Sequence, residues 1–230
     1  MKKTIALILS AVILLCCFSA CNSGDDQNNN AANDSQQPTE EVTEAPFVPA
    51  KANQIDKSEV TSIRDVSVTD EQTNYVLITV ANYGKMLVRL YPNVAPTAVK
   101  AFKENVSNGF YDSKNFDLVI KHSFIQCGNT DGEAPQPIYG EFKSNGFENN
   151  LSHTRGVLSL PRADDTHSDS SRFFICTKPS PALNPQHAAF GFVVYGADII
   201  DKIASVKIDA NQKPLSSIVI ESVKFVTLPQ

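Results

Sequence analysis

The sequence predicts a mainly β fold, a barrel or sandwich whose open ends are covered by two helices. Three observations lead to this expectation. The chain contains many short apolar segments, turn-rich loops separate them, and only two segments show a helical stripe of apolar residues. Because each stripe presents a single apolar face, each helix is expected to pack against sheet.

The strand candidates follow one another from Asn74 onwards. Val76–Val80 and Met86–Tyr91 are β-rich, and the turn residues Asn82–Lys85 lie between them, so the two segments are expected to form a hairpin. The remaining strand candidates are Phe116–Ile120, Phe124–Cys127, Gly156–Leu160, Phe173–Cys176, Ala189–Tyr195 and Ile218–Val226.

The two expected helices lie early and late in this series. The first begins at Pro96 and ends before Gly109, a combination typical of helix starts and ends. Its apolar stripe comprises Ala98, Val99, Phe102 and Val106. The second helix, Ala197–Ser205, is short, and its stripe comprises Ile199, Ile200 and Ile203.

The N-terminus has the features of an export signal. Two lysines precede the uncharged apolar run Ile5–Phe18, which is shorter than the roughly 20 residues of a membrane-spanning helix. The run ends in Phe18-Ser19-Ala20-Cys21, which resembles a bacterial lipobox except that Phe18 replaces Leu, Val or Ile. We therefore expect residues 1–20 to be a signal peptide and Cys21 to be lipidated. The alternatives are an ordinary secretory signal cut nearby and an uncleaved anchor.

The next segment is expected to be a disordered tether. Residues 21–50 contain six acidic residues and no Lys or Arg, and they are rich in Asn, Gln, Pro and Thr. Residues 51–73 are expected to form a polar lead-in, and residues 74–230 the folded domain. The expected location is the extracytoplasmic face of the cell membrane, reached by export and held by the lipid. The chain carries a formal net charge of −5, which gives no indication of a nucleic-acid partner.

Two cysteines, Cys127 and Cys176, fall within the expected domain. In an oxidising compartment they could form one disulfide. Both lie in apolar segments, and free buried cysteines are the alternative.

A series of motifs resembles the cyclophilin family. They are Leu90–Val99 followed by Phe102, Asn108–Asp112, Ile138–Phe142, His153–Leu160, Ser171–Thr177 and His187–Gly191. The resemblance runs from about Tyr75 to Phe225, in order and with matching spacing. It implies a closed, eight-stranded antiparallel barrel capped by two α-helices. It also implies peptidyl-prolyl cis-trans isomerase activity on proline-containing segments, and no metal or organic cofactor. The protein is expected to be a monomer.

The reaction requires the X-Pro peptide bond to rotate, against a barrier of about 18–20 kcal/mol. A cationic donor aimed at the nitrogen of the twisted bond stabilises the transition state more than the ground state. In the family, this donor is an Arg two residues after a Phe. Here the corresponding segment is Phe116-Asp117-Leu118, so Leu118 occupies the Arg position and Asp117 a position that is usually His.

The resemblance assigns the other site residues one by one. Gln126 matches the residue that binds the substrate backbone. Ser123 and Phe124 occupy two pocket positions that are usually Phe and Met. Phe174, Leu183 and His187 match further positions of the proline pocket. The expectation is therefore a retained pocket with altered catalytic chemistry.

Arg172 stands where the family usually has Gln, beside the catalytic Arg. One hypothesis is that its guanidinium extends into the space beside Leu118 and replaces the missing donor. The alternative is that it points to solvent or pairs with Asp117 or with an acid of the Asp164–Asp169 loop.

The histidines and the segment His167–Asp169 indicate no further catalytic or metal site. The four histidines lack metal-ligand spacing, so no metal site is expected. His167-Ser168-Asp169 contains the residue types of a hydrolase triad, but adjacent positions cannot supply its geometry. The main expectation is a prolyl isomerase that assists folding of exported proteins. The alternatives are a module that binds proline-containing segments without turnover, and a structural lipoprotein domain.

Overall fold

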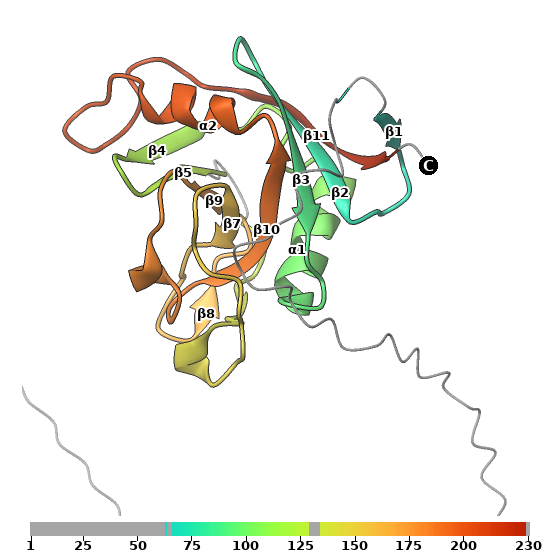
Figure 1. Ribbon diagram of the computed structural model, residues 1–230, viewed down its shortest axis with the longest axis vertical. Helices are drawn as coiled ribbons and strands as arrows, with labels where there is room; N and C mark the ends of the chain where they lie inside the picture. Colours follow the sequence, from blue (N-terminus) through green and yellow to red (C-terminus); the bar gives the residue numbers. More distant parts are fainter. Residues whose placement is uncertain (1–62, 64–65, 129–133, 229–230) are drawn as a thin grey trace, which may run out of the picture. The chain divides into compact units, whose positions relative to one another are not determined.

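The computed structural model describes residues 63, 66–128 and 134–228. The described chain forms one large antiparallel sheet with two α-helices, together with a small two-stranded sheet (Figure 1). The large sheet has the order β1-β11-β2-β3-β10-β7-β9-β5-β4. Its strands are β1 (Ser67–Thr69), β2 (Tyr75–Val80), β3 (Gly84–Leu90), β4 (Phe116–Ile120), β5 (Phe124–Cys127), β7 (Val157–Leu160), β9 (Phe173–Cys176), β10 (Ala188–Tyr195) and β11 (Ile220–Thr227).

The small sheet pairs β6 (Ile138–Tyr139) with β8 (His167–Ser168). Two 3₁₀ turns, η3 (Lys143–Asn145) and η4 (Pro181–Leu183), interrupt the loops around it. The predicted hairpin over residues 76–91 is confirmed as β2 and β3, which pair in register from Tyr75 opposite Arg89 to Val80 opposite Gly84.

The first helix, α1 (Pro96–Ser107), receives its N-terminal cap from a distant loop. The buried carboxylate of Glu141 accepts hydrogen bonds from the backbone N–H groups of Thr97 and Ala98, at 2.8 and 2.9 Å. Because the first N–H groups of a helix have no partner within the helix, and the helix dipole favours an anion there, Glu141 fixes this end of α1 to the β6–η3 loop.

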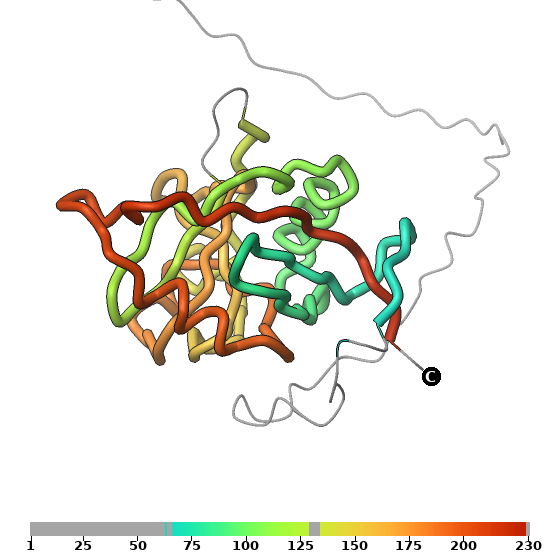
Figure 2. Tube along the Cα trace, turned by 90° about the horizontal axis from the view of Figure 1, so that it is seen from above, coloured from blue at the N-terminus to red at the C-terminus, as the bar shows by residue number. Residues whose placement is uncertain are grey.

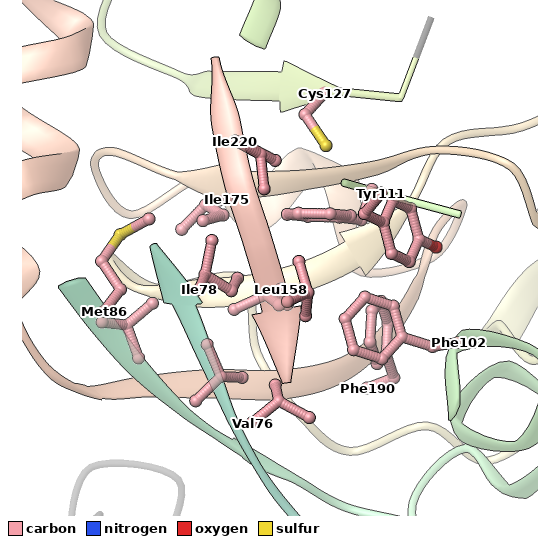
Figure 3. Close-up of a cluster of buried hydrophobic side chains, with 14 of the residues drawn as sticks. Val76, Ile78, Met86, Phe102, Tyr111, Cys127, Leu158, Ile175, Phe190 and Ile220 are labelled. Carbon is pink, nitrogen blue, oxygen red and sulfur yellow. The ribbon is translucent and has the colours of Figure 1, made fainter. Parts of the chain in front are cut away.

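The core lies between the sheet and α1. Alternate residues of the strands point inward, as Val76 and Ile78 do, and α1 contributes Phe102 (Figure 3). The ring of Phe102 lies 5.1 to 5.6 Å from the rings of Tyr111, Phe173 and Phe190. The second helix, α2 (Ala197–Ala204), buries its predicted stripe of Ile199, Ile200 and Ile203 in the same cluster. Both expected helices are confirmed.

The expected closed barrel of eight strands is not confirmed, because the sheet has nine strands in an open order that ends at β1 and β4. The residues just before β4 and β11 approach each other instead. The N–H of Phe116 donates to Ile218 O at 2.9 Å, and that of Ile220 donates to Lys114 O at 2.7 Å. The contact is confined to an isolated antiparallel bridge between Asn115 and Val219 and to the first residues of the two strands, so β4 meets β11 without forming a ladder.

The ninth strand comes from the segment before the expected domain. β1 pairs with β11, from Ser67 opposite Thr227 to Thr69 opposite Phe225, and Figure 2 shows the β11 tube running to it. A second small hydrophobic cluster lies here, built on the buried side chains of Leu77, Leu87 and Val226 and packed against Ile63 and Val66.

Several predictions concern parts of the chain outside the described residues. These are the signal peptide 1–20, lipidation of Cys21, the tether 21–50 and most of the lead-in 51–73. In the part of the chain that the structure describes, no helix is long and apolar enough to cross a membrane. Cys127 and Cys176 are both buried and both free, so the disulfide alternative does not apply to this structure.

Candidate proline-binding site

The predicted site residues Leu118, Gln126 and Phe174 form one row across three neighbouring strands. Leu118 of β4 lies opposite Gln126 of β5, and Gln126 lies opposite Phe174 of β9. Ser159 of β7 continues the row opposite Phe174. Because side chains alternate along a strand, and the neighbouring residue Ile125 points into the core, this row lies on the other face of the sheet.

An aromatic cluster lies on this face around Phe174, whose side chain is 1% exposed. The ring centroid of Phe174 lies 4.8 Å from that of Phe124 and 5.3 Å from that of His187, with the imidazole of His187 perpendicular to it. The ring of His153 stacks on Phe174 at 5.9 Å. Phe174 and His153 are buried, so the partly exposed rings of Phe124 and His187 are the ones that a proline ring can contact.

A buried hydrogen-bond network fixes His153. Its Nδ1 lies 2.9 Å from Asn184 Oδ1, and its Nε2 lies 2.9 Å from Ser159 Oγ. Since Asn184 Oδ1 can only accept, Nδ1 carries the proton and Nε2 accepts from the serine hydroxyl. Burial lowers the pKa of His153 to about 4, which keeps the imidazole neutral at physiological pH.

His187 and Leu183 are held together at the edge of the cluster. The backbone N–H of His187 donates to Leu183 O at 3.1 Å, at the end of η4. The Nδ1 of His187 lies 3.2 Å from Leu160 O, and burial lowers the pKa of this imidazole, with the charge of Arg162 adding to the effect. A neutral His187 therefore presents an uncharged ring edge to the site.

Gln126 lies beside this cluster, and the residue is 8% exposed. In the part of the chain that the structure describes, its side-chain amide makes no hydrogen bond to protein. An amide that is not bonded to protein has donor and acceptor groups to offer to the backbone of a bound segment.

The charged part of the site lies at the β-bulge of β4. Phe116 pairs with Cys127 and Leu118 with Gln126, so Asp117 is the extra residue of the bulge. Burial raises the pKa of Asp117, while the charges of Arg172 and Lys213 lower it. Asp117 Oδ1 is buried and has no hydrogen-bond partner within the described residues.

Arg172 pairs with an acid of its own loop. Its Nε lies 3.5 Å from Asp169 Oδ2, and its side chain is 38% exposed. Gly128 leaves room beside it, because a Cβ there would lie 2.4 Å from Ser171 O and 3.0 Å from the Cα of Arg172. This position agrees with the alternative in which Arg172 pairs with an acid of the Asp164–Asp169 loop. The charge effect on Asp117 shows that the guanidinium also lies near the bulge.

The comparisons with known proteins agree with this arrangement. The family model for "Cyclophilin type peptidyl-prolyl cis-trans isomerase/CLD" matches residues 75–225, which is well over half of the chain.

The chain belongs to the cyclophilin family.

Cyclophilins from distant organisms are similar to it. A peptidyl-prolyl cis-trans isomerase of Acinetobacter baylyi is 35% identical over 54% of this chain and 69% of its own length. The isomerase cyp15 of Rhizopus delemar is 34% identical over 59% of this chain and 22% of its own length. A putative peptidyl-prolyl cis-trans isomerase of Staphylococcus saprophyticus is 29% identical over 65% of this chain and 91% of its own length. The chain spans only about a quarter of the length of several curated relatives, including CYP71 of Arabidopsis thaliana at 26%.

Solved cyclophilin structures have the same fold. A crystal structure of a cyclophilin-type isomerase of Cryptosporidium parvum, determined in the presence of the dipeptide Ala-Pro, has a TM-score of 0.59 and 25% identity, and covers 65% of this chain and 97% of that chain. A second structure of that protein has a TM-score of 0.60 at 24% identity, covering 68% and 99% of the two chains.

Sequence reasoning missed several residues that shape this cyclophilin site. Asn184 and Ser159 hold His153, yet neither was expected to do so. His167 and Asp169, considered as parts of a triad, have other partners: His167 Nδ1 lies 3.0 Å from Asp164 Oδ2. Within the described residues, no group of three or more His, Cys, Asp or Glu could hold a metal ion.

Proposed function

We propose that this cyclophilin binds extended segments that contain proline and catalyses cis-trans isomerisation of the X-Pro bond slowly. The observation that carries the proposal is the ring cluster of Phe124, Phe174, His153 and His187 beside the unpaired amide of Gln126. The rings supply an apolar surface for proline, and Gln126 supplies hydrogen bonds for the flanking backbone. The Ala-Pro dipeptide present with the Cryptosporidium parvum relative supports this class of ligand.

The slow rate follows from Leu118. The twisted X-Pro nitrogen gains a lone pair, and a preorganised donor aimed at it lowers the barrier. Leu118 occupies the position that the resemblance assigns to the donor, and its side chain has no N–H or O–H. Arg172 is the candidate for a replacement, because it directly precedes β9, two residues before Phe174, and its charge acts on Asp117 in the β4 bulge.

Leu118 also favours a second candidate function. If no donor replaces the missing arginine, the domain is a module that binds proline-containing segments without turnover. The pocket supports both functions equally, because apolar contact and backbone hydrogen bonds bind substrate without accelerating rotation of the bond.

We further propose that the protein works as a monomer on exported proteins, at the extracytoplasmic face of a cell membrane. Support comes from the sequence: an apolar run of signal-peptide length, Cys21 in a lipobox-like tetrapeptide, and an acidic segment before the domain. X-Pro isomerisation takes tens of seconds without a catalyst, so newly exported chains are reasonable clients.

The test is an NMR exchange assay on an Ala-Pro peptide with the full chain and with Leu118→Arg. We expect the wild-type protein to bind the peptide and turn it over weakly, and Leu118→Arg to raise kcat/KM by about 100-fold. A wild type that binds without turnover, with an active variant, establishes the binding module. A fully active wild type contradicts the importance given to Leu118, and a wild type that does not bind the peptide contradicts the proposed function itself.

A further inference from the structure

A hollow of about 350 Å³ lies outside the ring cluster, where the β4–β5 turn, the end of β9 and the last turn of α2 meet. Figure 1 shows α2 beside β4 and β5 at this end of the sheet. The turn contributes Lys121 and His122, and the segment after β9 contributes Thr177 and Lys178.

The hollow carries unbalanced positive charge. Lys121 and Lys178 are exposed, and neither has an ion-pair partner among the residues that the structure describes. The acid in its wall, Asp201, is already neutralised, because its two carboxylate oxygens accept from Nε and Nη2 of Arg155 at 3.2 and 2.5 Å. Two lysines without a protein counter-charge therefore line the hollow.

Thr177 supplies a hydroxyl that has no partner. The residue is 5% exposed, and its Oγ1 is buried without a hydrogen bond to any described residue, although its backbone N–H donates to Ser123 O at 2.8 Å. Burial of a hydroxyl without a partner is unfavourable, and such groups in native proteins call for an explanation. A ligand oxygen in the hollow is one that this structure suggests.

His122 occupies a strained position in the turn. Its φ is +65°, in the left-handed region, and the turn is closed by a hydrogen bond from Ser123 N–H to Ile120 O at 3.0 Å. Glycine is the residue that takes this third turn position without strain. Strain of this kind is retained where the side chain has a use, and here the imidazole lies on the wall of the hollow.

We propose that this hollow is a binding site for an oxyanion, a phosphate or carboxylate group. The ammonium groups of Lys121 and Lys178 provide charge-assisted hydrogen bonds, the hydroxyl of Thr177 donates a third, and a ring N–H of His122 donates a fourth. The anion is either free or carried by the polypeptide bound at the ring cluster. The second source is within reach because Ser123, which binds the backbone of Thr177, directly precedes Phe124.

The first experiment titrates the full chain with inorganic phosphate at constant ionic strength, with chloride as the replaced anion, and follows the amide NMR signals of residues 121–123 and 177–178. We expect saturable shifts. The double variant Lys121→Gln/Lys178→Gln is expected to weaken binding by at least about tenfold, as expected for loss of two charge-assisted hydrogen bonds. Lys100→Gln, an exposed lysine of α1, is the matched control and is expected to leave binding unchanged.

Two further variants separate binding from structure. Thr177→Val removes a hydroxyl that has no protein partner, so the melting temperature should stay the same or rise while phosphate binding weakens severalfold. His122→Gly relieves the turn, so it should raise the melting temperature and weaken phosphate binding as well. NMR shifts that do not saturate with phosphate, or that persist unchanged in the double variant, overturn the proposal. So does a phosphate affinity equal to that of the wild type in the double variant, Thr177→Val and His122→Gly.

A second arm distinguishes the two sources of the anion and does not depend on isomerase activity. It compares the affinity of an Ala-Pro peptide that carries a nearby phosphoserine with that of the unmodified peptide. Tighter binding of the phosphopeptide that disappears in Lys121→Gln/Lys178→Gln identifies an anion borne by the bound polypeptide. Equal peptide affinities together with saturable binding of inorganic phosphate identify a free anion.

Discussion

At the scale of single residues, the guanidinium of Arg172 pairs with one acid and acts on the charge of another. Asp169 Oδ2 lies 3.5 Å from Arg172 Nε. Burial raises the pKa of Asp117, and the charge of Arg172 opposes this rise. Since Arg172 is the cation nearest to the vacant donor position in our proposal, we expect Arg172→Ala to reduce the remaining kcat/KM by at least about tenfold. The Kd for the peptide should change little, because the ring cluster is untouched.

Arg155→Ala is the matched control for this variant. Arg155 also pairs with one aspartate, Asp201, and its side chain is 39% exposed, against 38% for Arg172. Peptide exchange rates and peptide affinity should be measured for both. Equal activity of Arg172→Ala and the wild type would remove Arg172 from the mechanism.

The buried network of His153 makes stability depend on pH. In the folded state burial lowers its pKa to about 4, whereas in the unfolded chain it is about 6.5. The unfolded state therefore binds a proton first, and the stability that is present above pH 6.5 is lost as the pH falls toward 4. The loss from this group is on the order of 3 kcal/mol.

We expect His153→Gln to lose less stability than the wild type between pH 7 and pH 4.5, measured as the urea midpoint at each pH. His122→Gln, which changes an exposed histidine, should keep the wild-type pH dependence. His187 also has a lowered pKa, so part of the dependence should remain in His153→Gln. Identical pH profiles for His153→Gln and the wild type would contradict the assignment.

At the scale of elements, Gly128 determines how closely β5 and β9 approach after their last pair. Its φ is +102°, and a Cβ would lie 2.4 Å from Ser171 O. We expect Gly128→Ala to lower the free energy of unfolding by on the order of 2–4 kcal/mol, because overlap with backbone adds to conformational strain. Gly146→Ala is the control: its φ is +77° and nothing lies within 4 Å, so strain alone should cost about 1 kcal/mol. Similar urea midpoints for the two variants would refute the steric account.

The elements that the sequence predicted are those with a periodic apolar pattern of their own. The hairpin of β2 and β3, both helices and the longer strands were predicted because their alternation or helical stripes are local. The strands β1, β6 and β8 were not, since each has only two or three residues and exists through pairing with a distant segment. For the same reason the open order of the sheet could not be derived from local patterns.

The site residues also divide into those that local motifs predict and those that only the folded chain reveals. Gln126, Phe124, Phe174, Leu183 and His187 were found through motifs, and the structure brings them to one face of the sheet or its edge. The partners Asn184 and Ser159 were missed because Asn and Ser are common in loops and strands, and only the folded chain brings them to His153. Asp169 was one of several acids considered for Arg172, and the structure identifies it as the partner.

At the scale of the whole molecule, the order of the sheet separates the N-terminal strand from the proposed site. β1 is the first strand in that order, and β4, β5 and β9, which carry Leu118, Gln126 and Phe174, are the last three at the other end. The separation applies to the order of the ladders alone, because the start of β4 also meets the start of β11, the neighbour of β1. The sheet therefore nearly closes on itself, and its order alone does not place the N-terminal strand far from the site.

The anchor itself can be tested at Cys21. If Cys21 is the lipidated residue, the full chain with Cys21→Ser should no longer incorporate a lipid label. In detergent phase partitioning, the wild type should be found in the detergent phase and Cys21→Ser in the aqueous phase. Cys16→Ser and Cys17→Ser change cysteines of the same apolar run, so both should remain lipidated and membrane-bound. A wild type found in the aqueous phase would indicate an ordinary secretory signal cut nearby. A Cys21→Ser variant that stays with the membrane would indicate an uncleaved anchor. In that case the apolar run Ile5–Phe18 would hold the protein at the membrane without a lipid on Cys21.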